Sequence, residues 1–98
     1  MIRLSRDAER QLAALLRHYT RIGRSEAKQN LITVIDQAVE RIARDPSAGL
    51  PAPRPYPDLT QPGRAWIAVG SYWIAYSTTN PPVILAVFYA TADIPGRL

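Results

Sequence analysis

The sequence contains no cysteine and only one histidine, His18. The absence of cysteine excludes disulfide bonds, thiolate metal sites and cysteine nucleophiles. The remaining metal ligands are scattered carboxylates, and their spacing matches neither a calcium loop nor a magnesium site. A glycine-rich phosphate loop and a serine–histidine–acid arrangement are also missing. We therefore predict no metal and no cofactor, and we expect His18 to be structural or exposed to solvent.

Long apolar runs are missing as well. No segment approaches the roughly 20 residues that cross a bilayer. The first residues include Arg3, Arg6 and Asp7 and do not resemble a signal peptide. A length of 98 residues with 47% hydrophobic residues suits one globular domain. We expect a single cytoplasmic domain over residues 1–98, with no membrane partner.

Two segments show the periodicity of amphipathic helices. The first has an apolar stripe from Ala8 to Ile22, with Ser5 or Asp7 as N-cap and a glycine that suits its end. The second follows Ser25, a good N-cap, and stops before Pro46. Because only about two residues separate the segments, they should form an antiparallel helical hairpin. The broad apolar face of each segment indicates that both helices pack on something larger than each other.

The chain carries a net charge of +4, and its basic residues are concentrated in the first half. At about 100° per residue, five arginines fall opposite the first apolar stripe. They are Arg6, Arg10, Arg17, Arg21 and Arg24. Such a stripe is either a solvated helix face or a surface that docks an acidic protein or DNA phosphates. The candidate partner-binding residues among them are Arg10, Arg17, Arg21 and Arg24.

The segment from Pro46 to Pro62 holds six of the nine prolines. Its alternation P-A-P-R-P-Y-P favours extended polyproline II geometry. Segments of this kind can bind SH3 or WW domains. Because this one lies between structured elements of a small domain, we interpret it as a stiff linker.

The segment Arg64–Tyr76 predicts a β-hairpin, since two runs rich in aromatic and β-branched residues flank Gly70-Ser71. The alternation of side chains places Tyr72 and Tyr76 on one face, where we expect them in the core under the helices. Trp73 falls on the opposite face. We expect it to be exposed there and to mark a surface that a partner covers.

A further apolar strand over Val83–Tyr89 should have neighbours on both sides, and Ile2–Leu4 should form a short edge strand. The predicted order is β-α-α-β-β-β. The fold class is therefore α+β, with a helical hairpin packed on a small antiparallel sheet.

This order, with its hairpin motif G-R-x-W-x-x-V-G-x-Y-x-I-x-Y, resembles the RelE/ParE toxin superfamily over essentially the whole chain. The matching residues are Gly63, Arg64, Trp66, Val69, Gly70, Tyr72, Ile74 and Tyr76. The segment V-F-Y-A-T-A-D-I is similar to the closing strand of that family. The resemblance implies the toxin of a bacterial type II toxin–antitoxin system, neutralised by an antitoxin that wraps over it.

The resemblance leaves the target open between two branches. ParE-like toxins poison DNA gyrase, and RelE-like toxins cut mRNA in the ribosome. Metal-free RNA cleavage needs a base, a proton donor and cations for the developing phosphorane charge. Where the RelE-like branch often has histidine and arginine, this chain has Tyr89-Ala90-Thr91-Ala92. If the chain is a nuclease, its sparse site would consist of Arg64, Tyr89 and Arg97.

We favour the ParE-like interpretation, in which the protein binds gyrase and is not itself an enzyme. The helical hairpin and the C-terminal region, with Asp93 and Arg97 as candidate contact residues, would then bind partners. The alternatives are a RelE-like ribosome-dependent mRNA endoribonuclease and a non-toxic relative that still binds an antitoxin.

Overall fold

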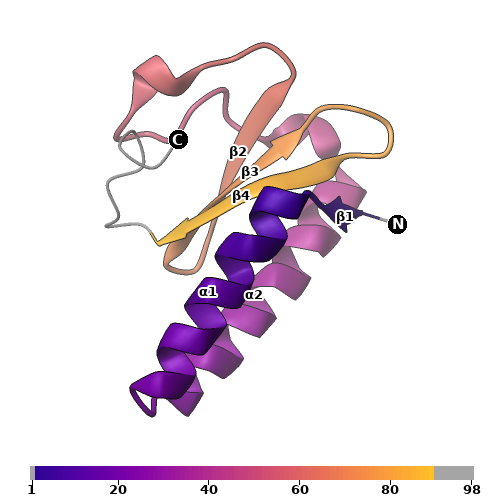
Figure 1. Ribbon diagram of the computed structural model, residues 1–98. Coiled ribbons are helices and arrows are strands. Elements are labelled where there is room, and N and C mark those ends of the chain that lie inside the picture. Colours follow the sequence, from indigo (N-terminus) through magenta and orange to yellow (C-terminus); the bar gives the residue numbers. More distant parts are fainter. Residues whose placement is uncertain (1, 90–98) are drawn as a thin grey trace.

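A computed structural model of the chain describes residues 2–89. The elements follow the order β1 (Arg3–Leu4), α1 (Arg6–Arg21), α2 (Ser25–Arg44), β2 (Arg64–Val69), β3 (Tyr72–Ser77) and β4 (Val83–Tyr89). Two single-turn 3-10 helices, Pro46–Ala48 and Pro57–Leu59, lie between α2 and β2. The predicted element order and the α+β class are both confirmed. Figure 1 shows the two helices side by side and antiparallel along one side of the sheet.

The helix ends follow the predicted caps with one exception. Ser5 is the N-cap of α1, and its hydroxyl accepts a hydrogen bond from the Ala8 N–H. Gly23 has a φ of 69°, a left-handed conformation that favours glycine, and it turns the chain between the helices. The prediction that Ser25 caps α2 is wrong, because Ser25 is already helical and Arg24 holds the cap position without a side-chain hydrogen bond.

The sheet has the strand order β1-β4-β3-β2. The β2–β3 hairpin pairs Val69 with Tyr72 around the predicted turn, where Gly70 has a φ of 57°. β3 and β4 are also antiparallel, and β1 lies at the edge as predicted. However, β1 pairs parallel to β4, so the sheet is mixed and only its three longer strands are antiparallel. The helices and the hairpin together provide the long crossover that a parallel pair requires.

One face of the sheet packs against both helices. Tyr72, Ile74 and Tyr76 project from β3 into this core and are almost completely buried, as predicted. Opposite them, the buried residues of the helices include Leu31 and Ile42. The broad apolar faces of the helices therefore pack on the sheet.

The other face of the sheet has a second core, covered by the proline-rich segment 46–62. Trp66, Trp73 and Phe88 form its centre, and Leu50 and Leu59 pack on them from the segment. Trp73 is only 6% exposed, so the expectation of an exposed partner surface is wrong. The chain covers this face itself.

The proline-rich segment does not keep one extended geometry. It contains the two 3-10 turns, and Leu50 forms an isolated antiparallel bridge with Trp66. The two backbone hydrogen bonds of this bridge are both 2.7 Å long. They attach the segment to the free edge of β2, which also protects part of that edge from pairing with another chain. Among residues 2–89, no helix combines the length and apolar character needed to cross a membrane.

Candidate functional site

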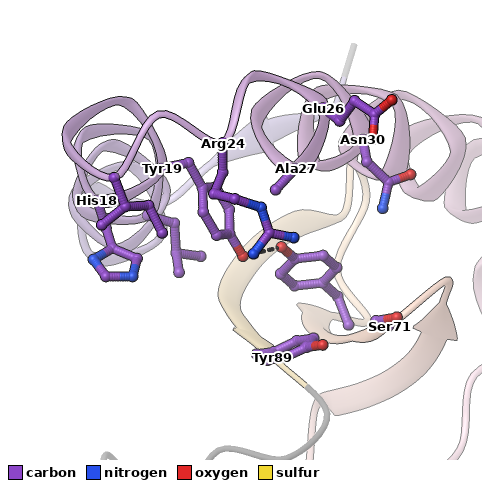
Figure 2. A pocket seen from close by; sticks show the side chains of 11 residues that line it. His18, Tyr19, Arg24, Glu26, Ala27, Asn30, Ser71 and Tyr89 are labelled. Carbon is purple, nitrogen blue, oxygen red and sulfur yellow. Dashed lines mark hydrogen bonds between the residues drawn. The ribbon is translucent and has the colours of Figure 1, made fainter.

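A cavity of about 760 Å³ lies at the tip of the helical hairpin. It lies between the end of α1, the start of α2, the β2–β3 turn and the end of β4 (Figure 2). We call it the tyrosine pocket. Its lining residues are Leu15, His18, Tyr19, Ile22, Arg24, Glu26, Ala27, Asn30, Ser71, Tyr72 and Tyr89.

Three tyrosines from different elements form the floor and one wall of the tyrosine pocket. The Tyr19 hydroxyl from α1 and the Tyr72 hydroxyl from β3 are 2.6 Å apart and share a hydrogen bond. The Tyr72 ring lies 5.4 Å from the Tyr89 ring, centroid to centroid, at an angle of 48°. Burial, followed by the hydrogen bond with Tyr19, raises the pKa of Tyr72. The Tyr72 phenol therefore stays neutral at physiological pH.

The hydroxyl pair offers one proton beyond the hydrogen bond it contains. The hydrogen bond between the Tyr19 and Tyr72 hydroxyls uses only one of their two O–H groups. In Figure 2 the Arg24 guanidinium extends toward the Tyr19 hydroxyl. The floor of the pocket thus combines a phenolic donor with a cation.

The mouth of the tyrosine pocket is apolar. Ile22 is 49% exposed and Tyr89 is 45% exposed. Within residues 2–89, Ile32 is the other large apolar residue classed as exposed, at 39%. The sequence placed Ile22 in the apolar stripe of the first helix. The helix ends at Arg21, so Ile22 lies at the C-cap, beyond the last residue that faces the core.

The arginine stripe is exposed, as its position opposite the core requires, but it does not form one surface. Arg24 lines the tyrosine pocket, while Arg17 and Arg21 border a second, shallower hollow together with Lys28 of α2. The turn between the helices separates Arg24 from the others, because the helical period no longer applies beyond Ile22. Arg10 is in an ion pair with Asp7.

The cations at the hairpin tip take part in none of the ion pairs found within residues 2–89. Within residues 2–89 the ion pairs are Arg10–Asp7 and Arg44–Glu40, and both are exposed. Neither pair includes a cation of the tip. These tip cations are Arg17, Arg21, Arg24 and Lys28. The tip is therefore a positively charged surface with an apolar pocket on one side.

The structure does not bring the two described nuclease candidates together. Arg64 pairs with Ser77 at one end of the sheet, while Tyr89 pairs with Tyr72 at the other end. On β3, the partners Tyr72 and Ser77 are five positions apart, which corresponds to about 17 Å along the strand. Arg97 and the partner candidate Asp93 lie outside the described residues.

Arg64 already has partners within the fold. Its guanidinium donates a 2.6 Å hydrogen bond to the Leu59 carbonyl and lies 5.3 Å from the centre of the Trp66 ring. These contacts hold the proline-rich segment against the second core. His18 is exposed beside Tyr19, and residues 2–89 contain no cluster of side chains that would bind a metal ion.

Sequence reasoning missed the tyrosine pocket because its residues come from distant parts of the chain. Tyr72 was assigned to the core, which is correct for its ring, but its hydroxyl also lines the pocket. The sequence feature that could have indicated the pocket is the turn between the helices, where an apolar residue, Ile22, is closely followed by a cation, Arg24. The Tyr19–Tyr72 hydrogen bond and the pairing of Tyr72 with Tyr89 together bring this turn near the end of β4.

Comparison with known protein families gives one match over almost the whole chain. A family model described as the ParE toxin of type II toxin–antitoxin system, parDE, matches residues 2–93. A search of curated proteins found no match. The family match spans both helices, the whole sheet and every residue of the tyrosine pocket.

Proposed function

The chain belongs to the ParE toxin family of type II toxin–antitoxin systems, and we propose that it inhibits DNA gyrase by direct binding. In this proposal the protein acts in the bacterial cytoplasm and stops growth, and a cognate antitoxin neutralises it. Inhibition by binding requires an exposed surface that fits the target rather than a catalytic centre. Arg17, Arg21 and Lys28 of the helical hairpin tip border the second hollow and take part in neither ion pair of residues 2–89, and they form the surface that we assign to the target.

The observation that carries this proposal is the separation of Arg64 from Tyr89. A metal-independent ribonuclease needs its base, acid and cations around a single phosphate, within hydrogen-bond reach of the reacting atoms. Here Arg64 lies at the opposite end of the sheet from Tyr89 and is bound to Leu59 and Trp66. The two residues therefore do not form one phosphate site.

The second sheet face supports the same conclusion. Within residues 2–89, the proline-rich segment packs over Trp66 and Trp73, so this face of the sheet is covered and does not itself offer a surface to an RNA strand. A group of cations that take part in neither ion pair of residues 2–89 gathers at the hairpin tip instead, where it suits acidic protein surfaces.

The test is a short pulse of expression in a bacterial host, with incorporation of labelled thymidine and labelled methionine followed together. Gyrase inhibition predicts that thymidine incorporation falls first and that cells form filaments. Purified gyrase with plasmid DNA should then accumulate cleaved DNA when the protein is added. An earlier fall in methionine incorporation would instead indicate the ribosome as the target. If neither label changes while soluble protein is present, the protein is a non-toxic relative.

A further inference from the structure

The mouth of the tyrosine pocket is built to receive an apolar side chain. Ile22 and Tyr89 both line the pocket and leave 49% and 45% of their surfaces exposed. Leu15 and Ala27 line the same cavity of about 760 Å³. A bulky side chain inserted here would bury apolar surface from two elements at once, as the anchor residues of protein interfaces do.

The lining of the pocket includes several hydrogen-bond donors beside the single carboxylate of Glu26. Arg24 carries five N–H donors and no acceptor, and it takes part in neither ion pair of residues 2–89. The paired hydroxyls of Tyr19 and Tyr72 add an O–H group. A carboxylate can accept from both kinds of donor, and charge-assisted bonds to arginine are the stronger ones.

The positive charge extends beyond the pocket. Around the hairpin tip, Arg21 and Lys28 border the second hollow and have no ion pair. Positive charge that spans both hollows favours a chain segment with several acidic groups, because a small anion would occupy only one site. Charge complementarity thus points to an acidic segment carrying a bulky apolar residue.

We infer that the tyrosine pocket is an anchor site for an acidic segment of the antitoxin. One bulky aliphatic or aromatic side chain of that segment enters between Ile22 and Tyr89, and a neighbouring carboxylate binds Arg24 and the hydroxyl pair. This inference rests on the proposed neutralisation by an antitoxin and adds the surface and its chemistry. The segment leaves the second sheet face untouched, because the chain's own loop already covers it.

The experiment compares matched variants of the exposed side chains. Ile22→Ala and Tyr89→Ala remove the mouth of the pocket, and Arg24→Glu reverses its cation. The controls are Ile32→Ala, an exposed isoleucine that does not line the pocket, and Arg54→Glu, an exposed arginine on the proline-rich segment. Thermal unfolding of each variant checks that the fold is intact. Where Tyr89→Ala is unstable, Tyr89→Leu serves in its place.

Affinity is measured by calorimetry with a purified candidate antitoxin, the product of a short reading frame sought next to the gene. We expect each pocket variant to bind at least about tenfold more weakly than the unchanged protein, with the controls within about twofold. Tyr89→Phe should keep wild-type affinity, because the ring rather than the hydroxyl forms the mouth. The loss caused by Arg24→Glu should shrink as salt is added.

A second readout separates failure of the inference from failure of the proposed function. We expect the pocket variants to keep inhibiting thymidine incorporation and to escape rescue when the antitoxin is co-expressed. Pocket variants that inhibit growth and are rescued normally would overturn the inference and leave the proposed function standing. Variants that bind antitoxin normally but no longer inhibit would assign the pocket to the target and also overturn it. If the unchanged protein binds no antitoxin, the proposed neutralisation and the inference fail together.

Discussion

The two faces of the sheet are both buried, but they are covered in different ways. Two amphipathic helices cover one face, and their buried residues repeat with the helical period. A proline-rich segment with two 3-10 turns covers the other face, where Leu50 and Leu59 pack on the tryptophans. Regular secondary structure is therefore not required to close a core. The irregular cover depends instead on a few specific contacts, and these can be tested one at a time.

The largest effect should come from removing the centre of the loop-covered core. Trp66 is fully buried, so Trp66→Ala should lower the free energy of unfolding by about 3–5 kcal/mol. Leu31→Ala, on the helix-covered side, should cost about 2–5 kcal/mol for the same reason. Urea denaturation followed by circular dichroism measures both. A loss below about 1 kcal/mol for Trp66→Ala would mean that the loop cover contributes little to stability.

A smaller effect is expected where the loop crosses the buried end of β3. A methyl group added at Gly49 would lie 2.8 Å from the Ala65 side chain and collide with the Tyr76 hydroxyl. Because both neighbours are buried, Gly49→Ala should cost about 1–3 kcal/mol. Ala48→Ser, at the exposed neighbouring position, is the matched control and should stay within about 0.5 kcal/mol of the unchanged protein. Thermal unfolding of both variants provides the comparison.

The contacts of Arg64 should hold the loop without supporting the helix-covered core. Arg64→Ala removes the hydrogen bond to the Leu59 carbonyl and the contact with the Trp66 ring, at a cost of about 1–2 kcal/mol. Amide hydrogen exchange should accelerate in residues 50–62 and stay unchanged in α1 and α2. Equal acceleration in the helices would show that the two covers are not independent. An RNA cleavage activity lost with this substitution would also contradict the non-enzymatic proposal.

The smallest effect on stability at neutral pH comes from the tyrosines of the helix-covered core. Their titration at alkaline pH distinguishes this core from the loop-covered one. Burial raises the pKa of both Tyr72 and Tyr76, which lie on the helix-covered side. Unfolded tyrosine loses its proton near pH 10.0, so the unfolded state releases protons before the folded state does. Stability from these groups is therefore complete below pH 10 and falls as the pH rises above it. Urea denaturation at increasing alkaline pH should show a shallower fall for Tyr72→Phe than for the unchanged protein, whereas Trp66→Phe should leave the slope as it is.

Most of the fold could be predicted because its elements depend on local sequence. The helical period, the Ser5 cap and the glycine in the β2–β3 turn act within a few residues. The cap at Ser25 was misassigned because Arg24 ends the turn one residue earlier than the side-chain preference suggests. The parallel pairing of β1 depends on how the chain crosses over, which two strand residues alone do not encode.

The candidate site was harder to predict for a related reason. Alternation correctly put Trp73 on the second sheet face, but exposure depends on what covers that face, and proline-rich segments have no period that reveals a buried side. The tyrosine pocket likewise depends on Tyr19 meeting Tyr72 across 53 positions of sequence. The arginines were found from sequence, while their division between two hollows required the geometry of the helix turn.

The strand order also has a consequence for synthesis. β4 lies between β1 and β3 but is the last of these strands to be translated. While it is missing, Arg3 and Leu4 have no strand to pair with, and one edge of β3 stays open. A nascent chain interrupted before Val83 thus lacks the middle of its sheet. The tyrosine pocket, which needs Tyr89, forms only when translation has passed the end of β4.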